Sequence, residues 1–239
     1  MFQNREGQRV PEVTFKILRD GALTPVTTSA LFADKTVVLF SLPGAFTPTC
    51  SSSHVPRFNQ LAPVFAANGV DDILCVSVND AFVMDAWKKD QEAENVTFIP
   101  DGSGHFTRGM GLLVDKDELG FGERSWRYAM LVRDGVIEKM FIEPDKPGDP
   151  YEVSDADTML DYLAPDAVKA SDVLLLTKPG CGHCRRARAA LEAKGVVYGE
   201  VSANLSMLRA VSDTPTTPRV FVDGALIGGA EELIAWLER

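Results

Sequence analysis

Short apolar runs alternate with helix-forming segments along most of the chain. Three runs have the length and composition of buried strands: VVLFSL at 37–42, ILCVSV at 73–78 and AMLV at 129–132. Between the first two, apolar residues recur at the three- and four-residue steps of one helix face, at Val55, Phe58, Leu61, Ala62 and Phe65. Strands separated by helices predict an α/β layer fold.

Local signals predict three further features of the same region. Asp80 stands before a second helical stripe and is a typical residue for starting a helix. Asp134-Gly135 separates two β-rich runs, which is the strongest short-range signal for a β-hairpin. Ser154 followed by Asp157 predicts a capping box at the start of a third helix.

A change in composition predicts a domain boundary. Residues 164–171, APDAVKAS, are small and polar without an apolar period, which is typical of a linker. From Asp172 onward basic and acidic residues balance at 8 each, so the whole formal charge of -10 lies on residues 1–171. We predict a domain over 1–163 and a smaller one over 172–239. In the second domain the patterns predict a strand, a helix, a strand, a short helix, two strands and a helix, in that order, which also indicates an α/β fold.

Length, composition and charge exclude several classes of protein. At roughly 150 residues per domain, 239 residues allow two unequal domains. No run approaches the ~20 apolar residues of a membrane helix, and the start, MFQNREGQRV, lacks the apolar region of a secretory signal. We therefore expect a cytoplasmic protein without a membrane partner. An excess of 34 acidic over 24 basic residues argues against nucleic acid as a ligand.

Cys50 has the setting of a reactive thiol. It follows a predicted buried strand and precedes an amphipathic helix, so free N–H groups of the first helical turn are expected to point at it. A free cysteine with a pKa of ~8.5 is only about 3% ionised at neutral pH, and a helix start with a nearby guanidinium favours the thiolate. Thr47 can hold a hydroxyl against the sulfur, and Pro43 can shield it from water. His54 is expected to be a polar residue of the first turn rather than a general base.

The surrounding residues resemble a known family. The tract PGAFTPTCSSSH carries P-x-x-x-T-x-x-C, the peroxidatic motif of peroxiredoxins, at Pro43, Thr47 and Cys50. Together with FGERSWRYAMLVRDGVIEKMFIEPD it is similar to the type-five subgroup. The resemblance implies a thioredoxin-like fold that reduces hydroperoxides, with an arginine ahead of the hairpin strand completing the site. The place of this arginine in the sequence assigns the role to Arg127 rather than Arg124.

A second thiol within this domain is not expected to reduce oxidised Cys50. Cys75 lies inside ILCVSV with apolar residues on both sides, which predicts an inert core thiol. The position near 150 that carries a resolving cysteine in type-five proteins holds Asp149, Pro150 and Tyr151 instead.

Cys181 and Cys184 form a C-x-x-C in TKPGCGHC, at a predicted strand-to-helix turn. In a cytosolic chain this pattern indicates a redox pair, with Cys181 at the helix start as the attacking thiolate. A structural zinc site that includes His183 is the alternative. Closed zinc sites take four ligands and no second pair of ligands lies nearby, so we expect no metal and no bound cofactor.

The second domain resembles a glutaredoxin, with CGHC, a Thr-Pro pair where that family has a cis-proline turn, and IGGAEEL. The resemblance implies a second thioredoxin-like domain that uses glutathione as reducing co-substrate. It assigns the contacts to glutathione to Lys178, Thr217, Pro218, Gly229, Ala230 and Glu231. His183 and Ala230 depart from the usual residues of the family.

Over its whole length the chain resembles bacterial peroxiredoxin–glutaredoxin fusions. Our hypothesis is that a hydroperoxide oxidises Cys50, glutathione captures the product, and Cys181 with Cys184 regenerates Cys50. A peroxide-responsive sensor or holdase, and a structural zinc protein, are the alternatives. The resemblance also implies a homo-oligomer.

Overall fold

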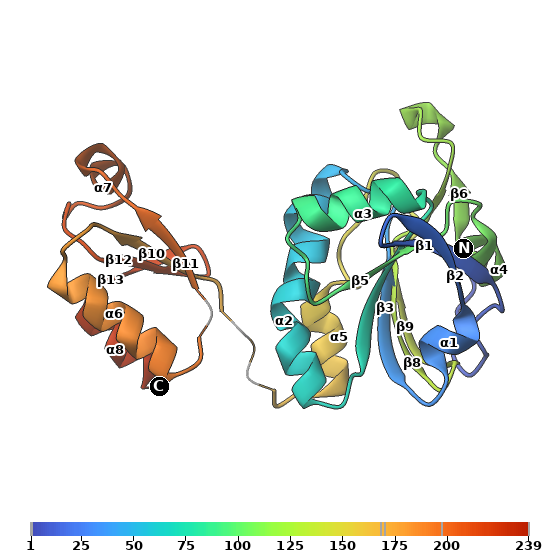
Figure 1. Cartoon of the computed structure of the whole chain (residues 1–239), viewed down its shortest axis with the longest axis horizontal. Helices are drawn as coiled ribbons and strands as arrows, with labels where there is room; N and C mark the ends of the chain where they lie inside the picture. Colours follow the sequence, from blue (N-terminus) through green and yellow to red (C-terminus); the bar gives the residue numbers. More distant parts are fainter. Residues whose placement is uncertain (1, 168, 170, 197, 239) are drawn as a thin grey trace. The chain divides into compact units, whose positions relative to one another are not determined.

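The chain forms two compact units, Met1–Lys169 and Ala170–Arg239, in a computed structural model (Figure 1). The structure describes residues 2–167, 169, 171–196 and 198–238. Within the predicted linker, Val168 and Ala170 lie outside the described residues. Each unit has its own sheet and its own apolar core, so each is described separately.

A five-stranded sheet in the order β5-β4-β3-β8-β9 forms the centre of the first unit. Its strands are β3 (Thr36–Ser41), β4 (Asp72–Ser77), β5 (Thr97–Pro100), β8 (Tyr128–Arg133) and β9 (Val136–Ile142). The first three are parallel, while β8 pairs antiparallel with β3 and with β9. Asp134 and Gly135 turn between β8 and β9 with φ of 45° and 74°, the positive values that a tight hairpin turn requires, so the predicted hairpin is confirmed.

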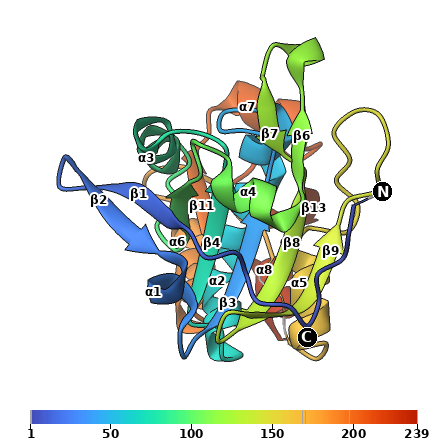
Figure 2. The same ribbon diagram turned by 90° about the vertical axis from the view of Figure 1, so that its right-hand side faces the viewer.

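Helices lie on both faces of this sheet (Figures 1 and 2). One face carries α2 (Val55–Ala67) and α5 (Ala156–Leu163), and the other carries α1 (Thr28–Phe32) and α4 (His105–Met110). The remaining elements are α3 (Ala81–Asp90) and two antiparallel hairpins, β1 (Thr14–Arg19) with β2 (Ala22–Thr27) and β6 (Leu113–Asp115) with β7 (Glu123–Ser125). A 3-10 turn, Asp117–Leu119, lies in the loop between β6 and β7. No helix among the described residues is long and apolar enough to span a membrane.

Of the two helix caps predicted from the sequence, the cap of α3 is confirmed and the cap of α5 is wrong. Asp80 caps α3 as predicted, because its carboxylate accepts hydrogen bonds from the Phe82 and Val83 N–H groups. The capping box predicted at Ser154 is wrong: Asp155 caps α5, and the Ser154 hydroxyl instead donates to Glu143. A buried carboxylate distant in the sequence competes for that hydroxyl.

Both faces of the central sheet are buried, which explains the nearly continuous apolar runs in its strands. On the α2 face, Phe40 of β3 stacks on Phe58 with ring centroids 4.2 Å apart. The opposite face belongs to a larger apolar cluster that includes Val37, Leu39 and Phe106, all at 0–1% exposure. The two helical layers therefore hold β3 rigidly, and β3 leads into the segment that carries Cys50.

The second unit has a four-stranded sheet in the order β11-β10-β12-β13. Its elements are β10 (Val173–Thr177), α6 (Gly182–Ala193), β11 (Tyr198–Ser202), α7 (Leu205–Val211), β12 (Arg219–Val222), β13 (Ala225–Gly228) and α8 (Ala230–Leu237). This order is the predicted one, although Val197 of the predicted VVYGEV strand lies outside the described residues. Leu175, Leu191 and Leu233, each fully buried, belong to the core between the sheet and α6 and α8.

Candidate active sites

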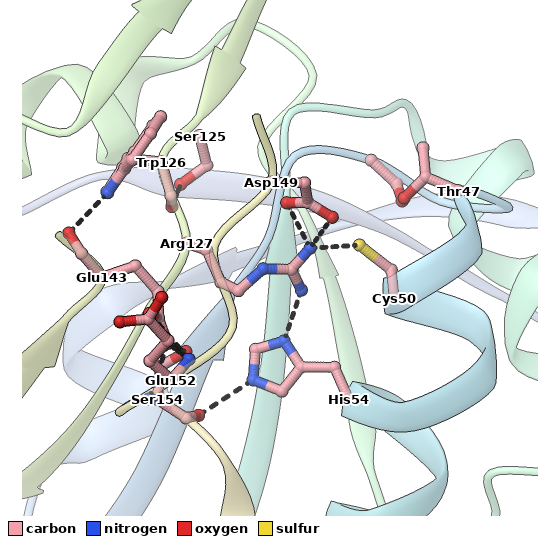
Figure 3. A network of polar contacts seen from close by, with 11 residues as sticks. Thr47, Cys50, His54, Ser125, Trp126, Arg127, Glu143, Asp149, Glu152 and Ser154 are labelled. Atoms are coloured by element: carbon pink, nitrogen blue, oxygen red, sulfur yellow. Dashed lines mark hydrogen bonds and ion pairs between the residues drawn. The ribbon is translucent and has the colours of Figure 1, made fainter. Parts of the chain in front are cut away.

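Cys50 lies in a wide π-helical turn, Cys50–His54, that continues directly into α2. Its side chain is fully buried. The helix has already begun at this point, because the Ser51 N–H donates to the Thr47 carbonyl at 3.0 Å. Among the hydrogen bonds of the described residues, the partner of the sulfur is Nη2 of Arg127 at 3.5 Å (Figure 3). A guanidinium therefore lies against this sulfur at the first turn of the helix.

Arg127 supplies the positive charge of the site. It directly precedes β8, whose antiparallel pairing with β3 sets Tyr128 opposite Ser41 at the end of β3 that leads to Cys50, and it is 1% exposed. Burial alone would lower the pKa of Arg127, but the negative charges of Cys50 and Asp149 outweigh burial and raise it. The guanidinium is thus a permanent cation that stabilises negative charge on the sulfur. Arg124 does not share this role, because it donates to the Val78 carbonyl at 2.9 Å.

His54 closes the π-helical turn and is a fully buried part of this network. Its Nδ1 lies 3.0 Å from Nη1 of Arg127, and its Nε2 lies 3.0 Å from the Ser154 carbonyl oxygen. Burial first, and then the charge of Arg127, place the pKa of His54 well below its usual value. The neutral ring therefore donates from Nε2 and accepts at Nδ1, which makes it a positioning residue for the guanidinium.

Glu143 fixes the loop on which His54 rests. Its carboxylate is 1% exposed and accepts hydrogen bonds from the backbone N–H groups of Glu152, Val153 and Ser154 at 2.8–2.9 Å. Hydrogen bonds to an ionised acceptor are about twice as strong as neutral ones. The chain of contacts runs from Glu143 through Ser154 and His54 to Arg127. Sequence reasoning missed this residue; its only signal was an acid at the end of a predicted hairpin strand.

The segment before Cys50 carries the other two residues of the motif. The Thr47 hydroxyl donates to the Gly44 carbonyl at 2.8 Å, which leaves its lone pairs able to accept a hydrogen bond. Pro43 is half-buried at the start of the same loop. Asn79, which the sequence did not single out, anchors this loop by accepting a hydrogen bond from the Ala45 N–H at 3.0 Å.

Cys75 is buried in β4 at 0% exposure. Burial raises its pKa well above the ordinary value, so the group remains a neutral thiol near neutral pH. We expect Cys75→Ala to leave the rate of peroxide reduction within about twofold and to cost about 1 kcal/mol of stability through a small cavity. Steady-state kinetics and chemical denaturation check both. A tenfold loss of turnover with a folded protein would mean that Cys75 takes part in the reaction.

The second site lies where β10 leads into α6. Cys181 and Cys184 form a disulfide, with Cys181 half-buried at the helix start and Cys184 fully buried one turn inside. The Cys184 N–H donates to Cys181 Sγ at 3.2 Å. The Thr217-Pro218 bond is cis, and the Thr217 carbonyl oxygen lies 3.4 Å from Cys181 Sγ. No cluster of three or more metal-ligating side chains is found in the described part of the chain.

The residues assigned to glutathione binding differ in their exposure and in the hydrogen bonds and ion pairs that they make within the chain. Lys178 is exposed, and Thr217 Oγ1 is buried without a hydrogen-bond partner among the described residues. Glu231 pairs with Arg186 through contacts of 2.7 and 3.2 Å. Gly229 donates its N–H to the Glu232 carboxylate, and Ala230 is buried at 6% exposure. The Gly229–Glu231 side of the site is thus occupied by the chain's own side chains.

Sequence comparisons divide the chain at the same place as the structure. Residues 5–160 match the Redoxin family and residues 173–227 match the Glutaredoxin family. The hybrid peroxiredoxin hyPrx5 of Haemophilus influenzae is 58% identical over 97% of this chain and 98% of its own. A Synechocystis peroxiredoxin, sll1621, is 59% identical over 65% of this chain and 89% of its own.

Solved structures resemble the first unit. A reduced Prx3 of Vibrio vulnificus in complex with hydrogen peroxide is 43% identical, covers 67% of this chain and 99% of its own, and superposes with a TM-score of 0.64. The antioxidant protein of Plasmodium falciparum, a 1-Cys peroxiredoxin, is 34% identical, covers 68% of this chain and 100% of its own, and has a TM-score of 0.65.

A thioredoxin-like fold with a thiol held against a buried guanidinium defines the class of thiol peroxidases. The predicted fold class, a peroxiredoxin domain followed by a glutaredoxin domain, is confirmed. The chain belongs to the peroxiredoxin family, as a hybrid that carries a C-terminal glutaredoxin domain, and its chemistry is the reduction of peroxide by a cysteine.

Proposed function

We propose that this peroxiredoxin is a glutathione-dependent peroxidase for hydrogen peroxide and small alkyl hydroperoxides, with Cys50 as the peroxidatic thiol. The Cys50 thiolate attacks one peroxide oxygen, the O–O bond breaks, and the alkoxide or hydroxide leaves with a proton from solvent. Arg127 stabilises the charge that moves from sulfur to oxygen, since its guanidinium already lies against the sulfur. Thr47 Oγ1 accepts a hydrogen bond from the substrate hydroxyl.

The glutathione dependence is supported by the lack of a suitable second thiol near Cys50 among the described residues of the first unit. Oxidised Cys50 is a sulfenic acid, which requires a thiol to return to the reduced state. Cys75 is buried in the core, and Asp149 and Tyr151 lie at the Cys50 site, where they contact Arg127. Glutathione therefore condenses with the sulfenic acid, which gives a mixed disulfide and water.

The glutaredoxin domain completes the cycle. Cys181 attacks the mixed disulfide on the glutathione sulfur, which releases Cys50 as a thiolate and leaves glutathione bonded to Cys181. A second glutathione then displaces it as glutathione disulfide. Where Cys184 displaces it instead, one glutathione is released and two glutathione molecules reduce the resulting Cys181–Cys184 disulfide. The sum converts ROOH and two glutathione into ROH, water and glutathione disulfide. The N–H of Cys184, directed at Cys181 Sγ, supports a thiolate at that position. Glutathione is a co-substrate in this proposal, and we expect the protein in the cytoplasm, where thiols are kept reduced.

The glutathione-binding residues follow from the same proposal. The exposed Lys178 is available to a carboxylate of glutathione, and the Thr217 backbone, which lies beside Cys181 Sγ, is positioned for its peptide backbone. The Arg186–Glu231 pair has side chains that are 52% and 67% exposed. Exposed ion pairs contribute about 0–1 kcal/mol, so the ammonium group of glutathione can displace Arg186 from Glu231.

A comparison of reducing systems tests the proposal. We expect sustained NADPH consumption with peroxide, glutathione and glutathione reductase, and at least about tenfold slower consumption with thioredoxin and its reductase at the same protein concentration. Faster turnover with thioredoxin would contradict the glutathione dependence. Oxidation of Cys50 without sustained consumption in either system would instead favour a peroxide sensor.

A further inference from the structure

Asp149 places a solvent-accessible negative charge at the Cys50 site. Both of its carboxylate oxygens lie 2.6 Å from Nη2 of Arg127, the same nitrogen that lies 3.5 Å from Cys50 Sγ. The Asp149 side chain is 41% exposed, whereas Arg127 is 1% exposed. The carboxylate is therefore the solvent-accessible member of this ion pair.

The charges around Arg127 do not cancel. In the reactive form of the site, in which Cys50 is a thiolate, one buried cation faces two anions, Cys50 and Asp149, while the neighbouring His54 ring is neutral. Tyr151 contributes only its aromatic face, 5.5 Å from the guanidinium carbon. The reactive site thus carries one excess negative charge on its accessible side, and an anion that approaches it is repelled.

The loop that carries Asp149 also has an anchor that does not involve the Asp149 carboxylate. Glu143 already anchors the following residues through the backbone N–H groups of Glu152, Val153 and Ser154 and through the Ser154 hydroxyl. The Asp149 carboxylate makes its contacts with Arg127 instead. Its charge can therefore be removed while the anchor of the loop remains.

We propose that Asp149 is a specificity-determining residue that makes Cys50 selective for neutral hydroperoxides over anionic ones. Hydrogen peroxide and simple alkyl hydroperoxides are neutral at pH 7 and reach the sulfur without an electrostatic penalty. An anionic hydroperoxide is repelled by the carboxylate or has to displace it from Arg127, which is selection by a repulsive element. The inference rests on the proposed peroxide reduction at Cys50.

A matched pair of substrates tests this role. The pair is a tertiary alkyl hydroperoxide that bears a carboxylate and the methyl ester of the same compound. We propose to measure the second-order rate constant for one round of Cys50 oxidation in the full-length reduced protein, by rapid quenching and mass spectrometry. The readout is the ratio of the acid to the ester, so any general loss of activity in a variant cancels.

Asp149→Asn is expected to raise this ratio by about tenfold at low ionic strength. Glu152→Gln is the matched control, since it removes a negative charge from the same loop, where Glu152 pairs with Lys146 and its side chain is 50% exposed. The control is expected to leave the ratio within about twofold. An unchanged ratio in Asp149→Asn, or an equal rise in Glu152→Gln, would overturn the proposal.

The wild-type protein provides a second measurement that does not depend on the folding of a variant. Salt screens exposed charges, with a Debye length of about 10 Å at 0.1 M ionic strength. The ratio of acid to ester in the wild type should therefore rise with added salt, and a flat ratio would also overturn the selectivity. Failure of the ester and of hydrogen peroxide to oxidise Cys50 at all would contradict the proposed function instead.

Discussion

Cys50→Ser is expected to reduce peroxide turnover by more than about a thousandfold, to the uncatalysed background. A serine hydroxyl does not ionise near neutral pH, and the thiolate is the reactive form of this position. The positive charge of Arg127 would remain in place without a nucleophile to stabilise. A coupled assay of NADPH consumption with glutathione and glutathione reductase measures the loss.

The same variant separates the two domains. Cys181 lies in its own unit with its own core, so Cys50→Ser should still transfer glutathione from a small mixed disulfide at the wild-type rate. Cys75→Ala, a second buried cysteine of the first unit, is the matched control for peroxide turnover. Residual peroxide turnover in Cys50→Ser, or loss of both activities in a folded protein, would refute the division of labour.

Cys181→Ser is expected to lower glutathione-driven cycling by at least about a hundredfold while it keeps one round of peroxide reduction per chain. The attacking thiolate at the start of α6 is lost, whereas the contacts of Cys50 are untouched. A rapid burst of one equivalent of peroxide followed by a stalled phase is the signature, measured by stopped-flow mixing. Unchanged steady turnover would mean that free glutathione alone regenerates Cys50.

Cys184→Ser is the matched control for this experiment. It keeps Cys181 and its attack on the mixed disulfide, so substantial turnover with glutathione indicates that a second glutathione releases the first.

A mixture of Cys50→Ser and Cys181→Ser protein tests whether Cys181 regenerates the Cys50 of its own chain or that of another chain. Recovery of turnover that rises with protein concentration indicates transfer between chains, and no recovery indicates transfer within one chain.

Much of the architecture was predictable from local patterns. The hairpin turn at Asp134-Gly135, the cap at Asp80 and the order of strands and helices in the second unit all follow from residues close together in the chain. The cis bond at Thr217-Pro218 was implied by the resemblance to glutaredoxins. The capping box at Ser154 failed because its hydroxyl bonds to Glu143, which is 11 positions away.

Both kinds of site could be recognised from the order of residues alone, because a P-x-x-x-T-x-x-C tract after a buried strand and a C-x-x-C at a helix start depend on local spacing. The tertiary structure decided what surrounds Cys50. Arg127 and His54 meet across 73 positions, and Arg127 and Asp149 across 22, once β8 pairs with β3. Burial and charge act through distances in space, and these distances exist only after the sheet has formed.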